Sequence, residues 1–276
     1  MNSEQNEFLN KTCVVTGAGG ALGGAVAEAV ARKGMRTVVL DIDAAAADKR
    51  VARIEEAGGK ALSCVCSVLD EGALENALAT IEGKFGSPDY LINAAGGNSP
   101  EGSTDCEFYS EEAEGRTFQD LSVEGMRRTF DLNYFGTVIP TKIFSRGMLK
   151  RKYGSIVNFS SISAMVPLTK VGSYSASKAA VVSFTKWLAV HYSKSNVRVN
   201  ALAPGFVMTE QLKFLHIDEK GEYTPRAKKV VAHTPMERYG KELELTGAVL
   251  WLLSGSASFV TGSVITLDGG FSSYSI

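Results

Sequence analysis

The chain has 276 residues, of which 45% are hydrophobic and 21% charged, and its 29 lysines and arginines against 30 aspartates and glutamates leave a net charge of −1. This composition excludes a disordered or fibrous chain, and the lack of a basic excess gives no support to nucleic-acid binding. No apolar stretch approaches the ~20 residues that span a bilayer, and the polar segment 1–10 lacks the pattern of a secretory signal. We therefore expect a cytoplasmic protein that acts on a small molecule and binds neither nucleic acid nor membrane.

The residue patterns alternate between strand and helix along the whole chain. In chain order they predict strands at 11–16, 37–40, 61–66, 90–93, 155–159, 197–202 and 263–267, and helices at 25–33, 43–57, 70–84, a segment ending near 150, 173–193 and 243–253. Such alternation is typical of parallel βαβ units. The sequence thus predicts an α/β fold, a single Rossmann-type doubly wound domain over residues 1–276 with a seven-stranded parallel sheet and helices on both faces.

Two longer stretches, about 97–120 and 205–240, interrupt this alternation. Both follow the carboxyl end of a predicted strand, where open α/β sheets bind their ligands. We expect them to be substrate loops. The first is rich in acidic residues, and a solvated acidic loop is the simpler interpretation of its composition.

A glycine-rich turn, Thr-Gly-Ala-Gly-Gly-Ala-Leu-Gly at 16–23, follows the first predicted strand and opens a helix. Its backbone N–H groups and the helix dipole can face a pyrophosphate. Asp41, directly after the second strand, can accept the adenosine-ribose hydroxyls and would repel a 2′-phosphate, although a strand-end cap is an alternative role. Asp43 is the expected helix N-cap. Because no lysine or arginine occurs at 17–22, we predict NAD(H) rather than NADP(H) as the cofactor.

Tyr174 and Lys178 lie four residues apart on one predicted helix, and hence on the same face. A phenol with the ordinary pKa near 10 is a poor base at neutral pH, and a neighbouring ammonium favours its ionised form. Thirteen residues upstream, the pair Ser160-Ser161 ends the strand that precedes this helix, and a hydroxyl there can bond a carbonyl or alkoxide that faces the tyrosine. The combination predicts a general acid/base centre at Tyr174.

Two asparagines, Asn93 and Asn133, stand in otherwise apolar surroundings and need partners if they are buried. They could simply satisfy backbone groups between helices and strands. Cys64 and Cys66 share a strand face, but the three histidines show no ligand spacing near them, so no metal site is predicted. In a reducing compartment the four cysteines would remain thiols.

From about residue 10 to residue 270, the order and spacing of these motifs resemble the short-chain dehydrogenase/reductase family. The resemblance implies a catalytic tetrad of Asn133, Ser161, Tyr174 and Lys178. In it, the tyrosine passes the proton, the lysine lowers the pKa of the tyrosine and holds the nicotinamide ribose, the serine orients the substrate oxygen, and the asparagine supports a proton-relay water. A homotetramer is also implied.

The same resemblance, together with the glycine turn, predicts the residues of the cofactor site. They are Gly17, Gly20, Ala21, Leu22, Gly23, Asp41, Ile42, Ser67, Val68, Asn93, Ala95, Gly96, Tyr174, Lys178, Pro204, Gly205, Val207 and Thr209. At Ser67 the family usually carries an aspartate beside the adenine, so this contact departs from the pattern.

Four shorter segments, at 95–100, 167–170, 187–191 and 234–240, are similar to the mannonate oxidoreductase (fructuronate reductase) branch of the family. This similarity implies NAD-dependent hydride transfer at a secondary hydroxyl of a sugar acid, D-mannonate or its keto form D-fructuronate. The predicted substrate residues are Ser161, Tyr174, Asn98 and Lys170, with Lys213 and Arg238 as further candidates for the carboxylate. Another ketogluconate-type acid, a polyol, a 3-oxoacyl chain and a non-catalytic NAD-binding sensor remain as alternatives.

Overall fold

The computed structural model describes residues 7–112 and 114–275, and thus leaves the first residues, Ala113 and Ile276 outside the description. The strands are β1 (Thr12–Thr16), β2 (Arg36–Asp41), β3 (Lys60–Val65), β4 (Tyr90–Asn93), β5 (Gly154–Phe159), β6 (Val197–Pro204) and β7 (Val264–Leu267). The helices are α1 (Ala21–Arg32), α2 (Ala44–Glu56), α3 (Glu71–Phe85), α4 (Val123–Phe130), α5 (Gly136–Arg151), α6 (Gly172–Tyr192), α7 (Glu210–His216), α8 (Pro225–His233) and α9 (Thr246–Leu253). A π-helical turn (Asp131–Phe135) joins α4 to α5.

The strands form one parallel sheet in the order β3-β2-β1-β4-β5-β6-β7. The chain first builds outward from β1 to β3 and then returns to place β4 on the other side of β1. The carboxyl ends of β1 and β4 therefore adjoin where the direction of winding reverses, which is where doubly wound sheets bind ligands. This topology confirms the predicted seven-stranded parallel sheet.

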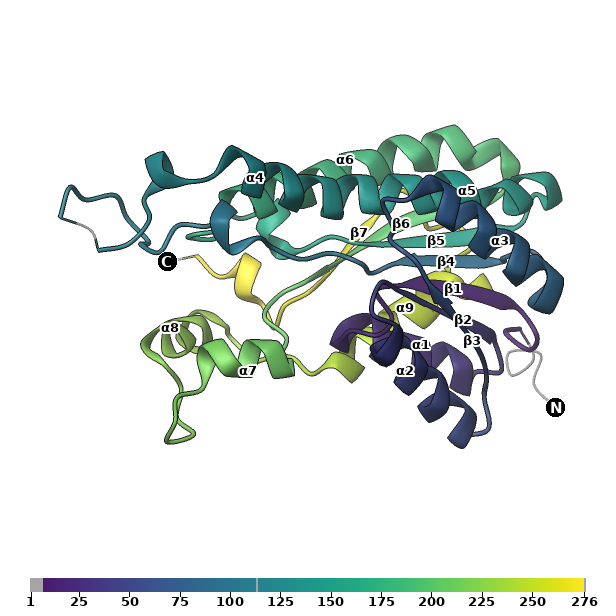
Figure 1. The fold of residues 1–276 in the computed structure, drawn as a ribbon, viewed down its shortest axis with the longest axis horizontal. Coiled ribbons are helices and arrows are strands. Elements are labelled where there is room, and N and C mark those ends of the chain that lie inside the picture. Colours follow the sequence, from purple (N-terminus) through teal and green to yellow (C-terminus); the bar gives the residue numbers. More distant parts are fainter. Residues whose placement is uncertain (1–6, 113, 276) are drawn as a thin grey trace.

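Helices cover both faces of the sheet (Figure 1). One core contains apolar side chains of α1, α2 and α9 packed on the sheet, and the other contains those of α3, α5 and α6. Because both faces are covered, β1, β4 and β5 are buried along their whole length. None of the helices in the described ranges has the length and hydropathy needed to cross a bilayer.

The first helix begins at Ala21, earlier than the predicted residue 25. Glycines are poor helix formers, and the prediction for this reason left Gly23 and Gly24 in the turn. Both lie inside α1, and glycine is required at position 23 because a Cβ there would collide with the backbone carbonyl oxygen of Gly17. Close packing thus overrides helix propensity here.

The two interrupting stretches differ from each other. The first has only two 3₁₀ turns, Pro100–Gly102 and Phe118–Asp120, among its described residues. The second is not simply a loop as predicted, because it contains α7 and α8, each capped by a threonine hydroxyl, from Thr209 and Thr224. Figure 1 shows these two helices together at one end of the molecule, away from the helices that cover the sheet.

Candidate active site

The glycine turn after β1 packs directly against the turn after β4. Gly17 has a φ of 65°, and a Cβ there would lie 2.7 Å from the Cα of Ala95, so only glycine fits. The hydroxyl oxygen of Thr16 accepts hydrogen bonds from the backbone N–H groups of Ala94 and Ala95, both at 3.1 Å. The two turns therefore form one rigid floor at the switch point of the sheet.

The N-terminus of α1 opens onto this floor. No side chain of the described residues caps it, and its first turn carries no acidic residue. The backbone N–H groups of Ala21, Leu22 and Gly23 belong to the first turn and so have no acceptor within the helix. Such a terminus suits the pyrophosphate of a dinucleotide.

Asp41 ends β2 beside the same turn. Its Oδ2 accepts a hydrogen bond from the N–H of Gly19 at 2.8 Å, and its Oδ1 accepts one from the N–H of Asp43 at 3.0 Å. The carboxylate thus braces the glycine turn and leaves further lone pairs for a ligand. Asp43 accepts from the N–H of Ala46 at 3.1 Å, which confirms it as the N-cap of α2.

Arg50 of α2 is a neighbour of the turn that sequence reasoning missed. Its guanidinium donates to the carbonyl oxygen of Gly20 at 3.2 Å and forms an ion pair with Glu28. Because Arg50 is far from the glycine turn in sequence, no local motif indicates this contact. The pairing with Glu28 offsets the positive charge that Arg50 brings to the turn.

Tyr174 and Lys178 lie on successive turns of α6, with the Nζ of Lys178 5.7 Å from the centroid of the Tyr174 ring. Ser161 lies two residues beyond the end of β5, and its hydroxyl is close enough to the phenol of Tyr174 to lower the pKa of that phenol. The Nζ of Lys178 is buried and donates to the carbonyl oxygen of Phe159 at 2.8 Å. The structure therefore brings these three predicted catalytic side chains together.

Burial shifts the titration of both ionisable members of this group. It raises the pKa of Tyr174, and the hydrogen bond with Ser161 lowers it only in part. Burial also lowers the pKa of Lys178 to about 8. The pKa of Tyr174 is therefore shifted upward, opposite to the direction expected from a neighbouring ammonium, and the phenol is protonated at neutral pH.

Asn133 lies in the π-helical turn, an irregularity that often marks functional sites. Its Nδ2 donates to the carbonyl oxygens of Gly97 at 2.7 Å and Thr129 at 2.8 Å, and its Oδ1 accepts from the N–H of Gly97 at 3.1 Å. A Cβ at Gly96 would lie 2.6 Å from the Oδ1 of Asn133 and 3.1 Å from the Nζ of Lys178. Glycine at 96 is what lets the asparagine and the lysine approach each other.

Asn93 has side-chain partners rather than the backbone partners proposed as its simpler role. Its Nδ2 donates to the Oγ1 of Thr141 and the Oδ1 of Asn158, both at 2.8 Å, in a buried network between the sheet and α5. Its own Oδ1 is buried without a hydrogen-bond partner among the described atoms. A contact between Asn93 and the cofactor stays a prediction.

The remaining predicted cofactor residues line the carboxyl edge of the sheet. The Ser67 hydroxyl accepts from the N–H of Leu69 at 3.2 Å, and the Thr209 hydroxyl accepts from that of Leu212 at 3.1 Å. Ile42 is exposed and Val68 is buried. Pro204 ends β6, and Gly205 and Val207 come within the next three residues. The N–H of Gly205 donates to the carbonyl oxygen of Leu267 at 2.9 Å. Their contacts with a nucleotide stay predictions.

The predicted substrate residues of the loops have local partners. The side chain of Asn98 donates to the hydroxyl of Ser103 at 2.6 Å, and Lys170 has a φ of 75°. Lys213 forms an ion pair with Glu210 at 2.7 Å, and Arg238 one with Glu244 at 2.7 Å. Asn98, Lys213 and Arg238 are thus engaged within their own segments, and the substrate contacts of Asn98 and Lys170 stay predictions.

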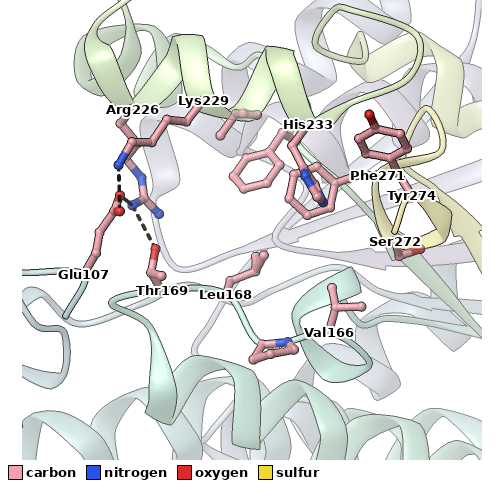
Figure 2. A pocket seen from close by; sticks show the side chains of 13 residues that line it. Glu107, Val166, Leu168, Thr169, Arg226, Lys229, His233, Phe271, Ser272 and Tyr274 are labelled. Atoms are coloured by element: carbon pink, nitrogen blue, oxygen red, sulfur yellow. Dashed lines mark hydrogen bonds and ion pairs between the residues drawn. The ribbon is translucent and has the colours of Figure 1, made fainter. Parts of the chain in front are cut away.

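A cavity of about 470 Å³ lies between the connection from β5 to α6, helix α8 and the C-terminal turn. Apolar side chains, among them Val166, Leu168 and Phe206, form much of its wall. Figure 2 shows charged side chains at one end of it, with Glu107 facing Arg226 and Lys229. Sequence reasoning named neither cation, because α8 lies in the segment that was expected to be a loop.

The cysteines and histidines of the described residues form no metal site. All four cysteines are free, and burial raises the pKa of Cys64 and of Cys66 to about 11. Within residues 7–112 and 114–275, no three His, Cys, Asp or Glu side chains are grouped so as to hold a metal ion.

A doubly wound parallel sheet, a glycine turn at its switch point and a Ser-Tyr-Lys group define an oxidoreductase of the short-chain type. The family model described as enoyl-(acyl carrier protein) reductase matches residues 17–272. The chain belongs to the short-chain dehydrogenase/reductase family, and is an oxidoreductase of the kind that uses a nicotinamide dinucleotide.

Three relatives show where in the family the chain lies. It is 44% identical to the uncharacterized oxidoreductase UxuB of Bacillus subtilis (strain 168), over 97% of each chain. It superposes with a TM-score of 0.94 and 42% identity, covering 99% of each chain, on an NAD-bound Haemophilus influenzae protein provisionally assigned as a D-mannonate oxidoreductase. A NAD⁺-bound xylitol dehydrogenase superposes with a TM-score of 0.84 and 30% identity, covering 96% of this chain and all of the other.

Proposed function

We propose that this protein is an NAD-dependent oxidoreductase that interconverts D-mannonate and D-fructuronate by hydride transfer at C5. The observation that carries the proposal is the group formed by Ser161, Tyr174 and Lys178 at the carboxyl edge of the sheet. The choice of substrate is supported by the similarity to the provisionally assigned D-mannonate oxidoreductase.

The cofactor is NAD(H). The open N-terminus of α1 would hold its pyrophosphate, Asp41 the hydroxyls of its adenosine ribose, and Lys178 those of its nicotinamide ribose. When bound, the nicotinamide supplies or accepts the hydride. The negative charge of Asp41 beside the uncharged glycine turn disfavours the 2′-phosphate of NADP(H).

Proton transfer falls to Tyr174. In reduction, its phenol, which is protonated at neutral pH, donates the proton to the carbonyl oxygen that becomes the new hydroxyl. The Ser161 hydroxyl donates a hydrogen bond to the same oxygen, and the ammonium of Lys178 stabilises the phenolate that remains. Oxidation runs these steps in reverse, with the phenolate accepting the proton. Asn133 holds the backbone at Gly97 beside this group.

The proposal predicts that D-fructuronate has a higher kcat/KM than 5-ketogluconate and than fructose, a neutral ketose, when NADH oxidation is followed by absorbance. The preference over fructose follows because a carboxylate gains charge-assisted hydrogen bonds that a neutral sugar cannot make, whereas the comparison with 5-ketogluconate tests the choice among sugar acids. A preference for the neutral ketose would refute the hexonate substrate and would favour a polyol, in line with the similarity to xylitol dehydrogenase.

We also propose a homotetramer, because α6 carries large apolar side chains on its exposed side. Trp187 is 59% exposed and Val190 77% exposed, and Trp187 stacks on Phe184. Light scattering should give four times the chain mass of 29.4 kDa. Trp187→Glu should yield smaller species, because a charge would be buried in the interface, whereas Lys186→Gln on the same helix should not. A wild-type monomer at micromolar concentration would contradict the proposal.

We place this activity in the cytoplasm. All four cysteines are free thiols, which suits a reducing compartment.

A further inference from the structure

A carboxylate from the first substrate loop reaches two cations of α8. The Oε2 of Glu107 accepts a hydrogen bond from the Nζ of Lys229 at 2.9 Å, and its Oε1 lies 3.6 Å from the guanidinium of Arg226. Arg226 also lies within a long hydrogen bond, 3.4 Å, of the hydroxyl of Thr169. Lys229, Arg226 and, more weakly, Lys170 lower the pKa of Glu107, which is therefore ionised at neutral pH. Figure 2 shows these four side chains together at one end of the cavity.

The segment that carries Thr169 also links two members of the catalytic group along the chain. Thr169 lies on the connection that leads from Ser161 to Tyr174, and α8 belongs to the segment that follows β6. The side chains of Glu107 and Arg226 are 23% and 30% exposed, so this ion pair is mostly covered. A ligand that enters the cavity, which residues 166–169 of this connection line, would meet an apolar wall and one cationic end.

We propose that Arg226 and Lys229 form the subsite for the carboxylate of the substrate, and that Glu107 occupies this subsite until the substrate replaces it. The inference rests on the proposed function, since it takes a sugar acid as the substrate. Both carboxylates would use the same N–H donors, with Thr169 adding a hydroxyl, so the subsite accepts one of them at a time.

The ion pair between Glu107 and Lys229 is weak enough to allow such an exchange. The side chain of Lys229 is 69% exposed, and an ion pair with an exposed lysine contributes little because solvent screens it. A substrate carboxylate loses little when it displaces Glu107, and the displaced loop carboxylate returns to water. In the described part of the chain Arg226 and Lys229 line the cavity, whereas Lys170 is not among its lining residues.

Steady-state kinetics on variants of α8 tests the cations. Arg226→Gln should raise KM for D-fructuronate about 10- to 100-fold, the loss expected for a charged hydrogen bond, with kcat and the kinetics of fructose little changed. Lys229→Gln should act in the same direction. Lys228→Gln is the matched control, because it removes the same charge from an exposed neighbouring residue that does not line the cavity. The same kinetics on Lys170→Ala test the carboxylate contact that was predicted from the sequence.

Glu107→Gln tests the exchange, because it should lower KM for D-fructuronate by about two- to fivefold by removing the competing charge. A higher KM in this variant would overturn the exchange. An equal loss for fructuronate and fructose in Arg226→Gln would overturn the subsite and leave the proposed function standing.

Calorimetry separates failure of the subsite from failure of the proposed function. D-Mannonate cannot react with NADH, so its binding to the NADH complex reports recognition without turnover. Binding that is lost in Arg226→Gln and kept in Lys228→Gln supports the subsite, even if fructuronate proves a poor substrate. Equal binding by the wild type and Arg226→Gln overturns it.

Discussion

Tyr174→Phe is expected to lower kcat by about 10²- to 10⁴-fold, the range for loss of a general acid/base, while NADH binds as in the wild type. The substitution removes only the phenol oxygen. The ring remains in its half-buried place on α6, and the ammonium of Lys178, which we assign to the nicotinamide ribose, is untouched. Stopped-flow reduction of D-fructuronate and fluorescence titration of NADH measure the two effects separately.

Lys178→Ala provides the contrast to that variant. It removes the buried ammonium that donates to the carbonyl oxygen of Phe159, so both turnover and NADH affinity should fall. If Tyr174→Phe kept more than about a tenth of the wild-type rate, a figure well above the range for an acid/base group, another side chain would have to pass the proton.

The wild type is expected to bind NADH at least about 100-fold more tightly than NADPH. The reason is that Asp41 and the 2′-phosphate of NADPH are both negative, and placing like charges side by side costs several kcal/mol. Asp41→Asn should bring the two affinities much closer. It removes the charge but keeps a side-chain oxygen that can accept from the N–H of Gly19, so the glycine turn should stay in place. Titrating both nucleotides by fluorescence measures the ratio.

Asp43→Asn is the control for that ratio. Asp43 is exposed and caps α2 through the N–H of Ala46, so its substitution changes the charge nearby without touching the glycine turn. The ratio of affinities should stay near that of the wild type. Equal or tighter binding of NADPH by the wild-type protein would refute the role assigned to Asp41.

The sequence by itself determined the seven strands of the sheet and their alternation with most of the helices along the chain. Buried parallel strands are short runs of β-branched and apolar residues, and these runs predicted all seven strands to within two residues at each end. The spacing of Tyr174 and Lys178 was equally informative, because a helix converts four residues of separation into one shared face. Local periodicity is sufficient for such features.

Only the tertiary structure decided where α1 begins, and it showed that Arg50 lies against the glycine turn. It also showed that burial raises the pKa of Tyr174, where the neighbouring ammonium was expected to lower it. These features depend on atoms that lie far apart in the sequence, and desolvation depends on everything that packs around a group.

The charged end of the cavity is the clearest case. Glu107 stood in a stretch whose composition indicated a solvated loop, and Arg226 and Lys229 in one expected to be irregular. The contact between Glu107 and Lys229 spans 122 residues, and no local pattern encodes it. The sequence could predict the catalytic group because its parts are close together along the chain or follow strands in a regular order, whereas substrate recognition depends on how separate loops and helices pack beyond the edge of the sheet.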